Sequence, residues 1–435
     1  MTARRGPGLL LVDVSPLRDS PAFRRMFVSR LILLFGVGMV SVTVPVHVFL
    51  LTGSTVLVGS VTSVEGLAFL CGFLFGGVVT DRFDRWRILQ VVRIGTVASF
   101  VGLTVNALVG GPVWLIGLLV AINGVSGATA ITATLAVLPG LVGRSRLHAV
   151  GALNTLSIRL GTTVAPVVGG AVAATAGPAW SYGLGAVTAL LTVTMNRRPR
   201  PAELAVDAGG LPGPAPPPEP PLRALRSGYR HILGDRVVSG VMAAGVVGML
   251  GAGSRVLLPA FASARFGNAP FVVGLMYSAM SAGLVLGTVS SGWVRRVARP
   301  GRLLLLLMVL CFLCFAAAGA APVLPVAVLG MAAAGMVNSV EEVLRYALLQ
   351  QRTPEEFLGR VNSAFAAQNM SGVAVGAFVA GLVGAWIHHP VAAFWMYNVA
   401  MAAVSVLVLP ALPTLWRHHA SPDEEAARPA GKADA

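Results

Sequence analysis

Two ionisable residues inside long apolar segments are the residues of this sequence that could do chemistry. Glu65 lies near the middle of one apolar segment, and Arg159 lies within another. A carboxylate in apolar surroundings can bind and release a proton, whereas an arginine keeps its charge and can contact an anionic ligand. The alternative is a structural ion pair between helices, and the sequence leaves both interpretations open.

We single out five further charged residues within the apolar segments. Arg255, Glu341 and Glu342 are additional candidates for a proton or substrate site, because an ionisable group at membrane depth costs at least about 2.5 kcal/mol. Arg30 and Arg345 lie nearer the ends of their segments. We expect these two side chains to extend to the membrane surface.

The composition indicates that the elements holding these residues are membrane-spanning helices. The chain has 435 residues, of which 55% are hydrophobic and only 11% are charged, and its mean hydropathy is +0.79. A soluble domain carries about a quarter charged residues. The net charge of +15 comes from arginines in short clusters between apolar runs, which is the positive-inside pattern and not that of a nucleic-acid-binding protein.

Twelve apolar runs have about the length that a bilayer span requires, roughly 20 residues. We therefore predict an all-α membrane protein with six helices on each side of a proline- and glycine-rich stretch. The runs are Phe27–Leu51, Val56–Val79, Ile88–Val109, Val113–Leu135, Val150–Ala176, Trp180–Met195, Val237–Ser263, Phe271–Val294, Leu303–Ala321, Val323–Leu349, Val361–Trp386 and Val391–Leu412.

These runs define the predicted domains. We expect a cytoplasmic tail (1–26), a six-helix bundle (27–195), a cytoplasmic linker with an amphipathic helix (196–236), a second six-helix bundle (237–412) and a disordered cytoplasmic tail (413–435). Arginines are concentrated in the connections on the side of both termini. This side is therefore predicted to be cytoplasmic, in a multi-pass protein of the cytoplasmic (inner) membrane.

The two predicted bundles share a sequence pattern. Pro45 followed by Leu57-Val58-Gly59 corresponds to Pro259 followed by Val272-Val273-Gly274. Gly161 and Gly170 correspond in the same way to Gly372 and Gly381. Two parallel six-helix repeats around a central pathway are an architecture for alternating access.

The charged stretch after the second run resembles a loop of the major facilitator superfamily. The family pattern G-x-x-x-D-R-x-G-R-R is matched at Gly77, Asp81, Arg82 and Arg85, with Asp84 in place of the second glycine. The resemblance implies the major facilitator fold and a conformational latch. Physically, Asp81 could hold a helix N-terminus of the other bundle or pair with arginine, and Gly77 would allow close helix approach. The alternative is positive-inside charge alone.

Two other stretches extend the resemblance. Gly161, Pro166, Gly169 and Gly170 are similar to the antiporter motif G-x-x-x-G-P-x-x-G-G of exporters in this superfamily, with Ala165 replacing one glycine. The alternative is a kinked, close-packed helix without directional meaning. The segments PAFRRMFVSR, TPEEFLGRVN (Thr353–Asn362) and AWSYGL (Ala179–Leu184) resemble the EntS-like siderophore exporters. Macrolide-efflux transporters share a loop like TPEEFLGRVN.

The resemblance implies a proton-coupled exporter of a siderophore or related small molecule. Its expected partners are a small-molecule substrate, the proton gradient and the lipid bilayer, with no nucleic acid. A multidrug or macrolide efflux transporter and a non-transporting membrane scaffold are the alternatives. We see no nucleotide-binding motif and no nucleophile–base or metal constellation, so we expect no enzyme, no cofactor and no metal site.

Overall fold

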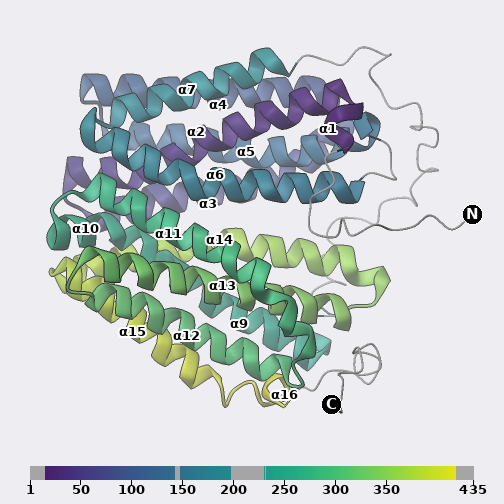
Figure 1. Ribbon diagram of the computed structural model, residues 1–435, viewed down its shortest axis with the longest axis vertical. Helices are drawn as coiled ribbons and strands as arrows, with labels where there is room; N and C mark the ends of the chain where they lie inside the picture. Colours follow the sequence, from purple (N-terminus) through teal and green to yellow (C-terminus); the bar gives the residue numbers. More distant parts are fainter. Residues whose placement is uncertain (1–14, 143–146, 197–229, 231, 418–435) are drawn as a thin grey trace, which may run out of the picture.

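The computed structural model describes residues 15–142, 147–196, 230 and 232–417, and all regular secondary structure in this part of the chain is helical (Figure 1). Most of the predicted linker and its amphipathic helix (197–229 and 231) lies outside the described residues. Residues 1–14, 143–146 and 418–435 lie outside them as well.

The first half of the described chain is a bundle of long helices preceded by one short helix. Turns of only two or three residues join most of the long helices, so neighbours in sequence run antiparallel. The helices are α1 (Ser15–Asp19), α2 (Pro21–Thr52), α3 (Thr55–Arg82), α4 (Arg85–Val109), α5 (Val113–Val142), α6 (Leu147–Thr175) and α7 (Pro178–Met195).

The second half has the same plan. Its elements are α9 (Arg236–Ala252), η3 (Gly253–Leu257), α10 (Leu258–Phe266), α11 (Ala269–Ser290), η4 (Ser291–Arg296), α12 (Pro300–Ala320), α13 (Leu324–Arg352), α14 (Glu355–Ile387), α15 (Pro390–Val408) and α16 (Pro413–Trp416).

The run Val237–Ser263, expected as one helix, is broken into α9, η3 and α10. A Cβ at Gly253 would overlap the backbone of Gly376 in α14, so the chain passes very close to its neighbour at this point. Pro259 stands at the start of α10, where it removes an amide donor from the helix. Close approach and proline together account for the change of helical form.

Two charged segments of the sequence, around Asp84 and Glu355, lie at the starts of helices. Only Phe83 and Asp84 separate α3 from α4, and the Asp84 carboxylate accepts a hydrogen bond from the Arg87 amide at 2.9 Å. Asp84 therefore caps α4, which gives a structural reason for an acid where the family pattern has glycine. The predicted loop Thr353–Asn362 is wrong for most of its length, because α14 begins at Glu355. Acidic residues are favourable in a first helical turn.

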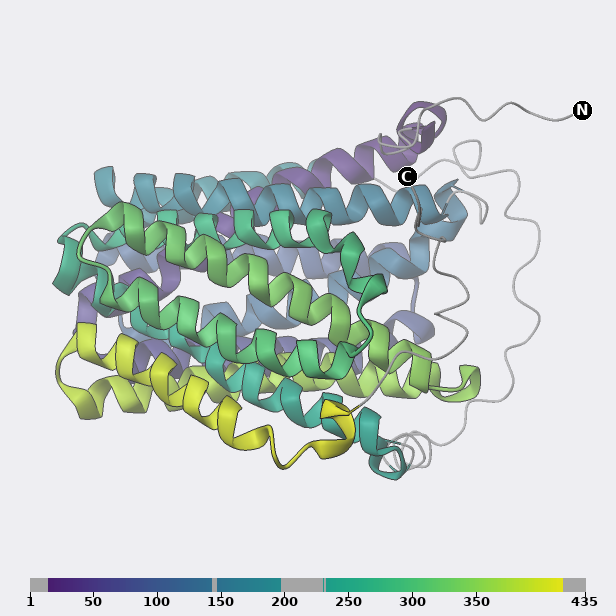
Figure 2. The ribbon, with the colours of Figure 1, turned by 60° about the horizontal axis from the view of Figure 1, so that its bottom comes forward.

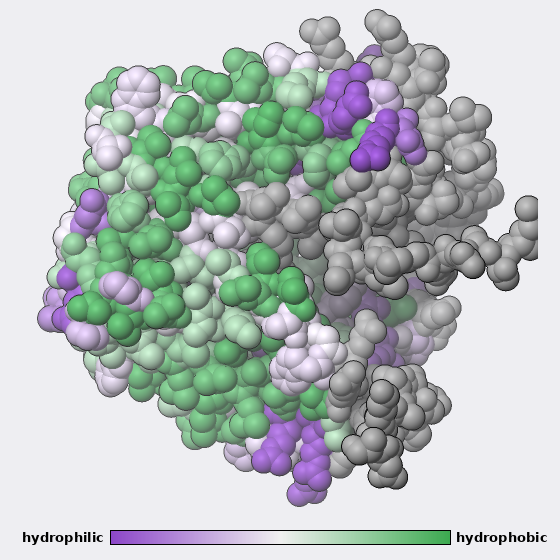
Figure 3. Space-filling view, viewed as in Figure 1, coloured by the Kyte–Doolittle hydropathy of each residue, from purple (hydrophilic) through white to green (hydrophobic). Residues whose placement is uncertain are grey.

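The helices are built for a membrane. Among the described residues, ten helical segments are long and apolar enough to cross one. Figure 3 shows hydrophobic side chains over most of the visible helical surface, with hydrophilic groups gathered towards its ends. Large apolar side chains such as Val289, Trp180 and Leu407 are exposed. This surface is suited to lipid and confirms an all-α membrane protein.

Helix pairings recur in the two halves. In the first half α3 packs on α5, α4 on α5 and α7, and α2 on α6 and α7. In the second half α11 packs on α13, α12 on α13 and α15, and α9 on α14 and α15. Figure 1 shows the two bundles one above the other. The predicted pair of six-helix pseudo-repeats is confirmed.

Two glycine seams join the halves, one between α3 and α14 and one between α6 and α11. A Cβ added at Gly59 would lie 3.2 Å from the Gly381 Cα, and one added at Gly170 would lie 2.9 Å from the Gly274 Cα. These are the glycines of the sequence repeat, so the repeat marks the contact between the halves.

Three described hydrogen bonds cross the seams. The Thr55 hydroxyl donates to the Gly381 carbonyl at 2.9 Å and the Ser63 hydroxyl to the Ala374 carbonyl at 2.6 Å. The Val167 amide donates to the Ser278 hydroxyl at 3.0 Å. The α3 seam begins at the start of that helix, which lies at the end of the bundle opposite α1 and α16 (Figures 1 and 2). The halves are therefore held together at the end remote from α1 and α16.

Candidate functional site

A cavity of about 310 Å³ lies inside the first half. Helices α2, α3, α4 and α5 line it, and α6 adds Ile158. Its charged lining residues are Arg30 of α2, Glu65 of α3 and Arg93 of α4, with Asn123 of α5 as a further polar group. Most of its other walls are apolar. Three charges on three helices thus converge in one largely apolar cavity.

Arg93 is the most deeply buried of these charges. Its side chain is 5% exposed, and its Nε and Nη1 atoms have no hydrogen-bond partner. Arg30 is half-buried and close enough to Arg93 for the two charges to repel each other. The expectation that Arg30 extends to the membrane surface is therefore wrong, since its side chain lines the cavity.

Glu65 has a polar neighbour within its own half. Asn123 lines the same cavity and lies close enough to interact with its carboxylate. Across the interface, Tyr277 of α11 lies within electrostatic range of both Glu65 and Arg255. Glu65 and Arg255 thus lie towards the boundary between the halves, one on each side of it.

Glu341 and Arg345 of the second half form a buried ion pair. Glu341 Oε1 lies 3.8 Å from Arg345 Nε, one turn along α13, and the Asn338 amide donates to the other carboxylate oxygen at 3.5 Å. The guanidinium carbon of Arg345 lies 5.0 Å from the centre of the Phe365 ring. Arg345 is only 2% exposed, so its predicted extension to the surface is wrong.

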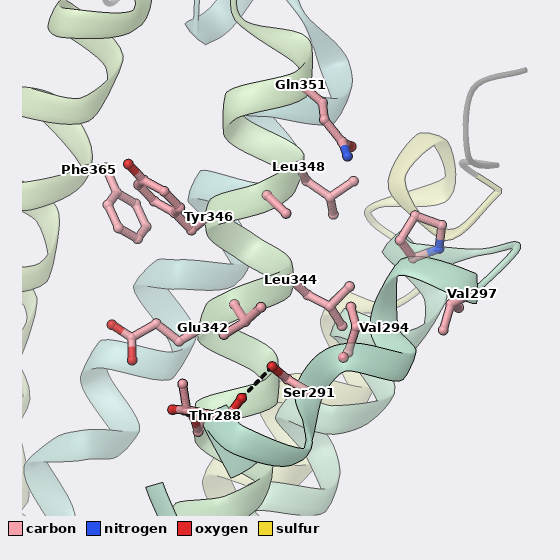
Figure 4. A pocket seen from close by; sticks show the side chains of 15 residues that line it. Thr288, Ser291, Val294, Val297, Glu342, Leu344, Tyr346, Leu348, Gln351 and Phe365 are labelled. Carbon is pink, nitrogen blue, oxygen red and sulfur yellow. Dashed lines mark hydrogen bonds between the residues drawn. The ribbon is translucent and has the colours of Figure 1, made fainter. Parts of the chain in front are cut away.

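Glu342 has different surroundings from Glu341. It is exposed and lines a second cavity of about 610 Å³ bounded by α11, η4, α13 and α14. Figure 4 shows Glu342, Tyr346 and Phe365 on one side of α13, and Leu344 and Leu348 on the other. The rings of Tyr346 and Phe365 lie 6.2 Å apart. An acid beside two aromatic rings can bind a cationic amphiphile.

The predicted pairing of Glu65 with Arg159 is not tested by these contacts. Arg159 belongs to α6, and its side chain lies outside the described part of the chain. Arg93 and Asn123 were not among the predicted site residues. Arg93 lies two turns inside α4, and its signal was a lone charge in the apolar run that follows Arg85 and Arg87.

The charged stretch around Asp81 forms contacts within its own half. The Arg85 guanidinium donates to the Ala136 carbonyl of α5 at 3.0 Å, and Arg82 is exposed. A Cβ at Gly77 would meet nothing within 4 Å, so the expected close helix approach does not occur there. Gly76, one residue earlier, has that role, since its Cβ would lie 3.0 Å from the Thr129 Cα. The Asp81 side chain is not among those described.

The glycines of the antiporter-like stretch in α6 are close-packed. A Cβ at Gly161 would lie 2.9 Å from the Leu34 Cβ, and one at Gly169 would lie 2.6 Å from the Met39 Cα, both in α2. Gly170 faces α11 across the seam, and Pro166 lies within the helix beside Gly274. One stretch thus joins α6 to its own half and to the other half.

Comparisons with known proteins settle the family. The sequence pattern described as Major Facilitator Superfamily matches residues 26–376. The chain belongs to the Major Facilitator Superfamily. It is 34% identical over 418 residues to Enterobactin exporter EntS of Shigella boydii serotype 4, covering 95% of this chain and 97% of that protein. The protein of the same name from Escherichia coli O81 matches with the same identity and coverage.

Solved structures of other transporters share the fold. The nucleoside transporter NupG aligns with a TM-score of 0.65 and 15% identity, covering 92% of this chain and 100% of that one. A point mutant of the peptide transporter POT aligns with a TM-score of 0.68 and 15% identity, covering 92% and 95%. The family match and the 34% identity to an exporter over 95% of the chain make this chain a multi-pass membrane transporter of a small molecule. Within the described residues, no group of three or more metal-binding side chains is close enough to hold a metal ion.

Proposed function

We propose that this protein exports a siderophore or a related small molecule by alternating access, driven by the proton gradient. The observation that supports the proposed cargo is the similarity to Enterobactin exporter EntS along 95% of the chain. The cavity supports it as well, because catecholates and hydroxamates are polar, often anionic groups that a buried arginine can bind.

The proposed orientation places both termini and the linker in the cytoplasm of a cell with an inner membrane. Arginines concentrated on that side support it. The seams then close the outer end, and the cavity lies on the cytoplasmic side of them, where cargo loads. A cysteine at Asn268 (N268C) should be labelled by an impermeant reagent from outside intact cells, and one at Asp207 (D207C) only after permeabilisation. The reverse pattern would overturn the orientation.

The latch and the antiporter motif have proposed roles in the cycle. Asp81, Arg82 and Arg85 would close the cytoplasmic end when the outer end opens, since carboxylate and guanidinium groups pair strongly at a helix terminus. The α6 glycines would let the halves rock about the seams. Glu65 would carry the proton, because it is an acid within the first-half cavity.

A second candidate function is efflux of cationic amphiphilic drugs such as macrolides. The cavity with Glu342, Tyr346 and Phe365 favours it, because an acid and aromatic rings suit a cationic amine (Figure 4). The two cargo classes make opposite demands. An anion needs the arginines of the first half, and a cation needs Glu342.

The deciding experiment measures the siderophore in the medium of iron-starved cells with and without the gene. We expect secretion to fall severalfold on deletion and to return with a plasmid copy. In proteoliposomes, an acidic outer compartment should drive export. Equal secretion by both strains, together with new macrolide sensitivity of the deletion strain, would replace the siderophore with the second candidate.

A further inference from the structure

We propose that Arg30 and Arg93 form the subsite that binds the acidic group of the cargo, which is therefore an organic anion. This inference rests on the proposed transport function and adds the residues and the charge of the cargo. The acidic group would be a carboxylate or an ionised chelating hydroxyl, and the Glu65 carboxylate in the same cavity would weaken its binding.

The unused donors of Arg93 are the first reason. A buried guanidinium is normally paired or hydrogen-bonded, because leaving it unpaired in an apolar interior is costly. Arg93 is 5% exposed, yet its Nε and Nη1 atoms have no partner in the described structure. Guanidinium N–H groups of this kind can bind a carboxylate through charge-assisted hydrogen bonds.

The second reason is the neighbouring charge. Arg30 of α2 lies near enough to Arg93 of α4 for mutual repulsion, and both line the same cavity. No described ion pair joins either arginine to an acid. Glu65 is the one acid among the described residues of the lining, and no described ion pair joins it to Arg30 or Arg93. Two cations and one anion leave the lining with a net positive charge, which a bound anion would neutralise.

The apolar side chains of the cavity and its volume indicate the polarity and size of the remaining part of the ligand. Leu33, Leu34, Val37, Phe69 and Ile131 make the cavity mostly apolar around the two guanidinium groups. A volume of about 310 Å³ is at the small end of ligand sites. It fits one aromatic acid group, so a larger cargo would place one acidic arm here and leave its remainder in the space between the halves.

Binding of small probes to the purified full chain tests the subsite without transport. Salicylate is an aromatic anion, and salicylamide is its neutral analogue of nearly the same shape. We expect the parent to bind salicylate more tightly than salicylamide. Substitution R93Q or R30Q should weaken salicylate binding by about tenfold or more, as expected for a lost charge-assisted hydrogen bond, with salicylamide unaffected.

Three further variants sharpen the test. R93K keeps the charge and loses the planar set of donors, so its affinity for salicylate should lie between those of the parent and R93Q. E65Q removes the opposing charge and should tighten salicylate binding severalfold. R302Q is the matched control, because Arg302 is exposed and lies over the Trp416 ring, far in the sequence from the cavity. It should bind like the parent.

The outcomes separate this inference from the proposed function. If R30Q and R93Q, both folded by size-exclusion chromatography, bind salicylate like the parent, the subsite is refuted, whatever the secretion result. Salicylate and salicylamide binding equally well would refute it too. If deletion leaves siderophore secretion unchanged while the arginine variants lose salicylate, the siderophore assignment fails and the anion subsite stands.

Discussion

The buried arginines of the two halves lie in opposite electrostatic settings. Arg345 in the second half has Glu341 at 3.8 Å and the Phe365 ring beneath it. Arg93 in the first half has a second arginine nearby and no described ion pair with an acid. The Nε and Nη1 atoms of both residues lack a hydrogen-bond partner, so the two arginines differ in the neighbouring charge. Both are at least 95% buried, so burial does not distinguish them.

The difference shows how a pseudo-symmetric transporter can divide its tasks. The charge of Arg345 is neutralised inside the protein, so removal of Glu341 would leave a buried charge without a counter-charge. The charge of Arg93 is not neutralised by a described acid, so in our proposal it binds the acidic group of the cargo. A buried charge therefore indicates a binding site only when its surroundings do not already neutralise it.

The largest expected effect is a loss of stability when the ion pair between Glu341 and Arg345 is broken. E341Q leaves Arg345 buried without a counter-charge, which should cost roughly 3–5 kcal/mol of stability. R93Q removes a charge that has no internal partner and should leave stability unchanged or raise it. Thermal unfolding of the two purified variants measures both. Equal destabilisation would mean that Arg93 has an internal partner after all.

The second effect concerns the seams, where each half contributes glycines that contact a helix of the other half. G59L and G274L should each disfavour closure of the outer end by about 1–3 kcal/mol, because a side chain would collide with the opposing helix. Transport should fall by about fivefold to a hundredfold. A cysteine engineered near the seam should become more accessible from outside.

The matched control for the seam variants is G77A. A Cβ at Gly77 meets nothing within 4 Å, so this variant should close its outer end as the parent does. Normal transport by G59L would show that the seam is not a moving contact.

The third effect tests whether the residue that couples transport to the proton gradient is Glu65 of the first half. E65Q should bind cargo but should no longer use the proton gradient, so export from proteoliposomes should drop to its level without a gradient. E342Q should retain coupling, because Glu342 lies in the exposed cavity of the second half. Undiminished proton-driven export by E65Q would transfer the role to Glu341, to Glu342 or to neither.

The smallest effects distinguish the two acids of the charged stretch. D84A removes the cap of α4 and should cost about 1 kcal/mol of stability, with transport little changed. D81N should keep stability and lower transport a few-fold, because the latch acts in the cycle and not in the fold. Unfolding and uptake measurements on the same preparations separate the two. A D81N variant that transports like the parent would remove the latch from the mechanism.

Composition and apolar run length were enough to predict the helices and their grouping into two halves. Both depend on the requirement that a bilayer imposes on any spanning segment. The break at Gly253 was not predictable in this way. A 3₁₀ segment is as apolar as an α-helix, and the break depends on how closely Gly376 approaches.

The site was only partly predictable. Glu65 was found because it is the lone acid of its run. Arg93 was missed because it follows two other arginines at the start of α4 and its importance lies in missing partners, which only the three-dimensional structure shows. Gly77 illustrates the same limit. Neighbouring positions on a helix point about 100° apart, so a motif could not tell whether Gly76 or Gly77 meets α5.

The glycine seams have a consequence for how readily the transporter changes shape. In lipid no hydrophobic effect holds two apolar helices together, and an interhelical hydrogen bond contributes only about 0.6 kcal/mol. The three hydrogen bonds across the seams thus bias the closed outer end by about 2 kcal/mol, a population ratio of roughly thirty. A ligand that prefers the other conformation by about 2 kcal/mol makes the two conformations equally populated, and one that prefers it by about 4 kcal/mol reverses the ratio. The seams consist of close backbone contacts and few interhelical hydrogen bonds. Binding of the cargo can therefore shift the equilibrium between the two conformations.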